Sequence, residues 1–147
     1  MENCLKKDEE ILAEIYRNAQ LALQSIVDIL PEVENEEIRT EILREHEIYE
    51  DFSARASMLA RDKGIELKEP NPFKKAMMWS SIKMSTLTDN SRSHIAEMMI
   101  RGTVMGITAL KTSENDAGNG ADPDVMALLR ELIEAEESFE ETLKKYL

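Results

Sequence analysis

Residues 38–63 read IRTEILREHEIYEDFSARASMLARDK, and their apolar or small side chains recur in alternating steps of four and three. This spacing predicts a helix with one buried face. The pattern has a single gap, at Glu45, where a carboxylate stands in place of a hydrophobic residue. A buried ionised carboxylate is costly unless it is paired, protonated or bound to a metal. The seam around the gap is formed by Ile38, Ile42, Tyr49, Phe52, Ala56 and Leu59.

The rest of the chain shows the same helical periodicity and no β-strand pattern, so the predicted fold class is all-α. Pro31 ends the first helix because proline excludes the helical conformation from the residue before it. Asn35, Asn71 and Asp122 are plausible N-caps, and Gly64 a plausible C-cap. The predicted helices cover about residues 8–30, 36–63, 72–87 and 91–111, and a last helix from Pro123 onward.

Connection lengths predict how these helices are joined. Residues 31–35 and the turn-rich SENDAGNGAD, residues 113–122, are short links that join antiparallel neighbours. The connection between the second and third long helices is long and holds the helix 72–87. At 1.5 Å per residue, a helix of about 15 residues spans about 22 Å, enough to carry the chain along a bundle. We therefore expect one domain, residues 1–147: a four-helix bundle with an additional short helix in this crossover.

Two stretches carry unusual side chains. The short helix places Phe73, Ala76, Met77, Ser80, Met84 and Leu87 on one face. Trp79 is expected to anchor this helix by packing, and the methionines are expected to fill the core rather than bind soft metals. The third long helix contains Gly102 and Gly106, which cost roughly 1 kcal/mol each relative to alanine. We expect both glycines to mark a close backbone approach to a neighbouring helix.

Composition excludes several classes of partner. The 147 residues carry a formal net charge of −12, which argues against binding to nucleic acid or to an anionic membrane face. No apolar run approaches the length of a membrane span. The single cysteine, Cys4, permits no internal disulfide and favours a reducing compartment. The expected location is the cytoplasm.

The last helix repeats the anomaly of the second, because Glu136 stands in its apolar seam between Leu132 and Phe139. The number of residues between each glutamate and the end of its helix indicates how far along the bundle axis it lies. In a crossover bundle, Glu45 and Glu136 are expected at about the same position along this axis, together with residues of the other two long helices. The candidate polar cluster therefore comprises Gln20, Glu45, Tyr49, Glu97, Arg101 and Glu136.

The layout resembles the ferritin-like superfamily, in particular small, largely uncharacterised bacterial bundle proteins in which a Trp-containing short helix precedes the third long one. The similar stretch is FKKAMMWSSIKMSTLTDNSRSHIAEMMIRGTVMGITALKT, residues 73–112. Di-iron members carry one Glu on each of two helices and Glu-x-x-His on each of the other two. By this resemblance, Glu45 and Glu136 would be the glutamates of the two pairs. Ile48 and Phe139 stand where the histidines would be.

The missing histidines predict no metal and no other cofactor, and leave two interpretations of the cluster. In one, it is a remnant site where Arg101 supplies the positive charge and pairs with Glu45 or Glu136. In the other, both glutamates lie at seam edges and reach water. The resemblance places Gln20 and Glu97 at the lone-Glu positions. If iron or manganese does bind, the candidate ligands are Glu41, Glu45, Glu97, Glu136 and Glu140.

The absence of metal-binding and catalytic motifs limits the functional hypotheses. We expect no catalytic residues, because no nucleophile–base pair, phosphate-binding loop or HExxH motif is present. The leading hypothesis is a non-catalytic or metal-depleted ferritin-like bundle with a structural or interaction role, forming a homodimer through helix faces. The alternatives are a degenerate iron- or manganese-binding protein of the storage or oxidase type, and a helical sensor or adaptor module. The sequence specifies neither a substrate nor a protein partner.

Overall fold

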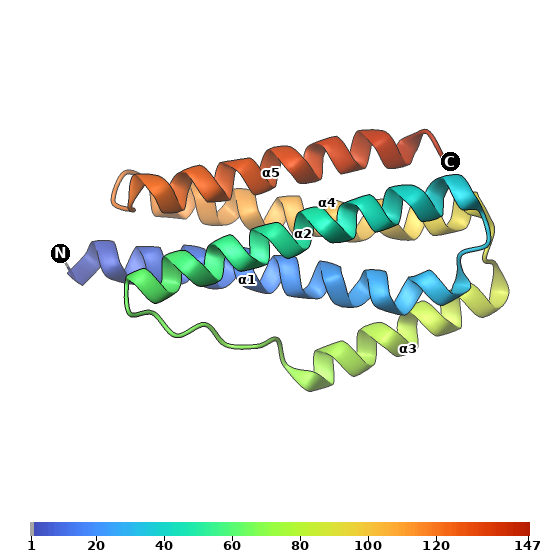
Figure 1. Cartoon of the computed structure of the whole chain (residues 1–147), viewed down its shortest axis with the longest axis horizontal. Coiled ribbons are helices and arrows are strands. Elements are labelled where there is room, and N and C mark those ends of the chain that lie inside the picture. Colours follow the sequence, from blue (N-terminus) through green and yellow to red (C-terminus); the bar gives the residue numbers. More distant parts are fainter. Residues whose placement is uncertain (1) are drawn as a thin grey trace.

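The computed structural model describes the backbone of residues 2–147 and the side chains from residue 6 onward, so the side chain of Cys4 lies outside the described part. Every regular element in residues 2–147 is helical, which confirms the all-α prediction (Figure 1). No helix in this range is long and apolar enough to cross a membrane. The elements are α1 (Glu2–Ile29), the 3₁₀ turn η1 (Leu30–Glu32), α2 (Glu36–Asp62), α3 (Pro72–Thr88), α4 (Arg92–Ala117) and α5 (Pro123–Lys144).

Side-chain caps begin four of these helices. Each capping oxygen accepts a hydrogen bond from a backbone N–H two or three residues ahead, which satisfies one of the free donors of the first turn. The caps are Asn35, Asn71, Ser91 and Asp122. α4 is longer than predicted and runs into the segment expected to be a turn. It ends only at Gly118, whose φ of 57° lies in the region that glycine adopts without strain.

The long helices alternate in direction along the chain, except across the crossover (Figure 1). α1 and α2 are antiparallel, and so are α4 and α5. Between these pairs the chain returns along the molecule through an extended link and α3, so that α2 and α4 run in the same direction. α1 packs against α2, α3, α4 and α5, while α5 also packs against α2 and α4.

In the described part of the chain, a hydrophobic core lies among α1, α2, α4 and α5. Fully buried side chains from all four helices meet there, including Leu12, Ile42, Leu110 and Leu132. α3 adds the buried Ile82 and the partly buried Met78 to this core and rests mainly on α1. The positions of the four long helices therefore depend on one another, whereas α3 lies outside them.

The apolar face predicted for α3 points to solvent. Phe73 is 69% exposed and Leu87 85% exposed, while the opposite face packs through Ile82 and Thr86. The predicted anchoring role of Trp79 is wrong: its side chain is half exposed, and the ammonium of Lys83 lies 6.0 Å from its ring centre. We call the outward face the α3 stripe, which consists of Phe73, Ala76, Met77, Ser80, Met84 and Leu87.

Candidate functional site

Glu45 of α2 and Glu136 of α5 are both buried in the core, with exposures of 1% and 2%. Each occupies a core-facing position in an apolar seam, as the helical period predicts. The charge of Glu136 makes a small contribution to the raised pKa of Glu45. The interpretation in which both glutamates reach water is therefore wrong, because neither lies at the edge of its seam.

Residues from all four long helices surround Glu136. The hydroxyl of Tyr49 donates a hydrogen bond to its Oε2 at 2.7 Å, and the side chain of Asn18 on α1 also hydrogen-bonds to it. The backbone of α4 comes close at Gly106. A Cβ atom at this position would lie 2.8 Å from Asn18 Nδ2 and 2.8 Å from Glu136 Oε2. Because glycine has no Cβ atom, position 106 leaves room for the side chains of Asn18 and Glu136.

Two neighbours of Glu45, Glu41 and Arg44, belong to its own helix, α2. It shares a hydrogen bond with Glu41, which is itself 8% exposed. Arg44 holds Glu41 with two hydrogen bonds, from Nε at 2.9 Å and from a terminal nitrogen at 2.6 Å. Its guanidinium also lies 5.6 Å from the ring centre of Phe139. The positive charge nearest to these carboxyls therefore comes from Arg44 on α2, and not from Arg101 on α4 as predicted.

Burial raises the pKa of both carboxyls into the neutral range. Loss of solvation raises the pKa of Glu45 to about 8, and the charge of Glu41 adds to this effect. Burial also raises the pKa of Glu136 to about 7, against the opposing hydrogen bonds from Tyr49 and Asn18. Burial and the neighbouring Glu136 together raise the pKa of Tyr49 well above its ordinary value. At pH 7, the cluster therefore carries less negative charge than its composition suggests.

Protons also account for the hydrogen bonding inside the cluster. Among the described side chains, three buried oxygens of this region have no hydrogen-bond partner: Asn18 Oδ1, Glu45 Oε2 and Glu136 Oε1. A protonated carboxyl is a donor as well as an acceptor, whereas a carboxylate only accepts. Protonation of Glu45 lets it donate to Glu41, which also accepts two hydrogen bonds from Arg44. A proton on Glu136 likewise gives a donor to a region that otherwise holds an excess of acceptors.

The structure does not bring Glu97 and Arg101 into this cluster. They form an ion pair with each other, and their side chains are 46% and 73% exposed. Around α4, they lie about 180° and 140° from the core-facing Gly106. The hypothesis that Arg101 pairs with Glu45 or Glu136 is therefore wrong. Gln20 is also separate, because its amide donates to Ser53 Oγ at 2.7 Å rather than to a glutamate.

Asn18 and Gly106 are the members of the cluster that the candidate set omitted. The glycines did predict close approach, which is confirmed for Gly106 and wrong for Gly102, whose Cβ position has no atom within 4 Å. Asn18 offered a weaker signal: asparagine is unfavourable inside helices and often has a specific hydrogen-bonding partner there.

The metal that the resemblance implies does not fit these residues. Arg44 already holds Glu41, and neither histidine faces these carboxyls, because His46 contacts Glu50 and His94 contacts Ser85. Among the described side chains, no three His, Cys, Asp or Glu groups are arranged to hold a metal ion. Glu140 instead makes an ion pair with Lys144 at 3.5 Å.

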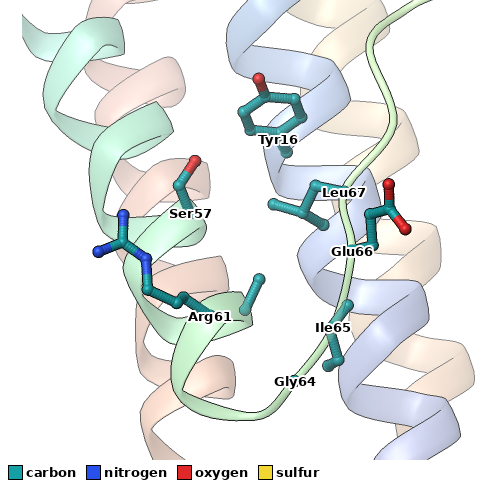
Figure 2. A pocket seen from close by; sticks show the side chains of 8 residues that line it. Tyr16, Ser57, Arg61, Gly64, Ile65, Glu66 and Leu67 are labelled. Carbon is teal, nitrogen blue, oxygen red and sulfur yellow. The ribbon is translucent and has the colours of Figure 1, made fainter.

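An open groove of about 460 Å³ lies apart from the cluster, between α1, the end of α2 and the link that follows (Figure 2). Leu67 points toward the helices and Glu66 points away from them. The Tyr16 hydroxyl donates to Glu69 and fastens the link, and this bond raises the pKa of Tyr16 to about 12. The groove is lined by Tyr16, Ser57, Ala60, Arg61, Gly64, Ile65, Glu66 and Leu67. No member of the carboxylate cluster lines it.

Comparisons with known proteins give no assignment. No family model, no curated protein and no solved structure matches this chain.

Proposed function

We propose that this chain is a ferritin-like four-helix bundle of α1, α2, α4 and α5, with α3 in its crossover, and that it serves as a non-catalytic protein-interaction module in the cytoplasm. The single observation that carries the interaction role is the exposed apolar stripe of α3. The direction of the helices supports the bundle: a long connection that leaves α2 and α4 parallel is typical of ferritin-like folds with one crossover.

The α3 stripe is too apolar to be an ordinary solvated surface. Its four large side chains are between 58% and 85% exposed and lie on one face of one helix. Each 100 Å² of apolar area removed from water stabilises a complex by roughly 2.5 kcal/mol before the costs of association. Contiguous apolar patches on a folded surface typically mark interaction sites. The large side chains of the stripe are Phe73, Met77, Met84 and Leu87.

The charge of α3 also sets it apart from the rest of the chain. α3 contains three lysines and no acidic residue, whereas the whole chain has 30 acidic residues and a net charge of −12. The exposed apolar side chains of α3 favour a protein partner over nucleic acid, because the net charge of −12 on the whole chain repels phosphate groups.

The carboxylate cluster has a structural role in this proposal. Glu136 forms polar contacts with Tyr49 and Asn18 that join α1, α2 and α5 beside the backbone of α4. Buried hydrogen-bonded groups of this kind fix how helices meet. The cluster would then hold the bundle in one register and position the helix that supports α3.

Metal titration tests the non-metal part of the proposal. We expect elemental analysis after expression with added iron and manganese to give far less than one metal per chain. Added Fe(II) or Mn(II) should shift the melting temperature by less than about 1 °C, because a ligand that does not bind the native state adds no stability. Stoichiometric metal together with a rise of several degrees would contradict the proposal and favour the degenerate iron- or manganese-binding alternative.

Site-specific photo-crosslinking in cells tests the interaction role. A photoreactive phenylalanine analogue in place of Met84 should give discrete crosslinked proteins. The same analogue in place of Glu137, a half-exposed residue of α5, serves as the matched control and should give none. Substitution Met77→Glu should remove the crosslinks by placing a charge in the apolar contact. Absence of crosslinks at all four large positions of the α3 stripe would overturn the interaction role.

A further inference from the structure

We infer that the partner of the α3 stripe is a second copy of this chain, whose own α3 packs against it in the antiparallel direction. The inference rests on the proposed interaction role and names its partner. Two independent features of α3 carry it: the order of side-chain sizes along the stripe and the placement of charge at the helix ends.

The stripe has nearly the same order of sizes in both directions. Two large residues, Phe73 and Met77, precede the small Ser80, and two large residues, Met84 and Leu87, follow it. An antiparallel copy with Ser80 near the two-fold axis places Phe73 opposite Leu87 and Met77 opposite Met84. Such a contact is self-complementary, as the interface of a symmetric dimer must be. The small residue at the centre lets the two backbones approach.

The charges of α3 oppose its own helix dipole. Lys74 and Lys75 lie in its first turn, which holds no acidic residue, and its last turn holds no basic residue. Cations are unfavourable at the positive N-terminal end of a helix and favourable at the C-terminal end. In the antiparallel pair, these lysines lie beside the C-terminal end of the other α3, about one turn from its exposed Asp89. Lys83 adds little repulsion, because Glu32 pairs with it at 2.6 Å.

Other occupants fit less well. A parallel second copy would place four lysines at one end of the pair and would leave both C-terminal ends without a cation. An anionic membrane would attract the lysines of α3, but the net charge of −12 on the chain opposes its approach.

A contact between two single helices lies at the low end of specific interfaces, roughly 1,000 Å² in total. We therefore expect a concentration-dependent dimer with a dissociation constant in the micromolar range.

Sedimentation equilibrium of the full chain tests the dimer, over concentrations from about 1 μM to about 1 mM, which bracket this affinity. Met77→Glu combined with Met84→Glu should weaken dimerisation at least about tenfold, since a buried charge is costly. Met58→Glu is the matched control, because Met58 is 61% exposed on α2, outside the stripe. Circular dichroism checks that each variant remains helical.

Disulfide trapping tests the antiparallel direction in a Cys4→Ser background. Ser80→Cys should form an intermolecular disulfide under mild oxidation, because the two copies of this residue meet near the axis. Phe73→Cys should not, since the two copies would lie about 20 Å apart along the helices, and a disulfide needs Cα atoms within about 7 Å.

The outcomes separate this inference from the proposed function. A dimer that the double stripe substitution disrupts, that Met58→Glu leaves intact and that Ser80→Cys traps supports the inference. A monomer at every concentration overturns it, while crosslinks from Met84 to a different protein would then leave the interaction role in place. Equal trapping at positions 73 and 80 overturns the antiparallel arrangement. Binding of the monomer to anionic lipid vesicles through the stripe overturns the inference in favour of a membrane surface.

Discussion

Glu136→Gln is expected to raise the free energy of unfolding by about 3 kcal/mol at pH values near 9. The pKa of this carboxyl rises from 4.5 to about 7 on folding, mainly because folding buries it. Glutamine keeps the shape of the side chain and a carbonyl oxygen that accepts the bond from Tyr49, but it never has to ionise. The variant therefore avoids the cost that wild type incurs at high pH.

The sign of the pH dependence follows from the raised pKa. Between pH 4.5 and about 7, the folded carboxyl holds a proton that the unfolded chain has released. The folded state then binds more protons, so the stability of wild type falls as the pH rises through this window. Glu45 acts in the same direction up to a pH of about 8. The effects of substituting Glu45 and Glu136 should not be additive, because the two groups interact.

Urea unfolding at pH 5, 7 and 9 measures this effect. The gain from Glu136→Gln should be small at pH 5 and largest at pH 9, because only ionisation of the wild-type group creates the difference. Glu137→Gln removes a half-exposed carboxylate from the adjacent position and should change stability by less than about 0.5 kcal/mol. A variant no more stable than wild type at pH 9 would show that Glu136 ionises in the folded protein without cost.

Gly106→Ala is expected to destabilise the protein by about 2 kcal/mol, whereas Gly102→Ala should stabilise it by up to about 1 kcal/mol. Both substitutions improve the helix propensity of α4. At position 106, the new methyl group would lie 2.8 Å from side-chain atoms of Asn18 and Glu136, so the buried hydrogen bonds of the cluster must shift. At position 102, the methyl group meets no atom within 4 Å.

The two glycines therefore form a matched pair on one helix, which urea or thermal unfolding compares directly. The difference between the variants isolates the steric effect, because the change in propensity is common to both. Equal stabilisation by both alanines would show that the cluster adapts freely and that α4 does not need to approach it closely.

The helical period was sufficient to place three members of the cluster. Glu45, Tyr49 and Glu136 lie in strong seams of leucine, isoleucine and phenylalanine, so their inward direction follows from neighbours one turn away. Helix ends with side-chain caps, such as Asn35 and Asp122, were similarly predictable because the capping chemistry is local.

The orientation of α4 was not predictable in the same way. Its candidate face mixes glycine, alanine and methionine, which give little hydrophobic contrast, so the period could not separate Gly106 from Gly102 or show that Arg101 faces water. In α3, the inward face was hard to predict for a different reason. This helix has apolar residues on two faces, and only packing against α1 decides that Ile82 turns inward while Phe73 turns outward.

The position of α3 outside the core also affects which substitutions the chain tolerates. α3 buries only Ile82 and Thr86, and the entropy of closing a crossover grows slowly with its length, by about 0.6 kcal/mol for each doubling. The other four helices could therefore close over a crossover of different sequence, or of somewhat different length, at little thermodynamic cost. Selection for folding consequently constrains the outer face of α3 only weakly. Its side chains are free to change with the surface that we propose they recognise, while the core that holds Glu45 and Glu136 stays the same.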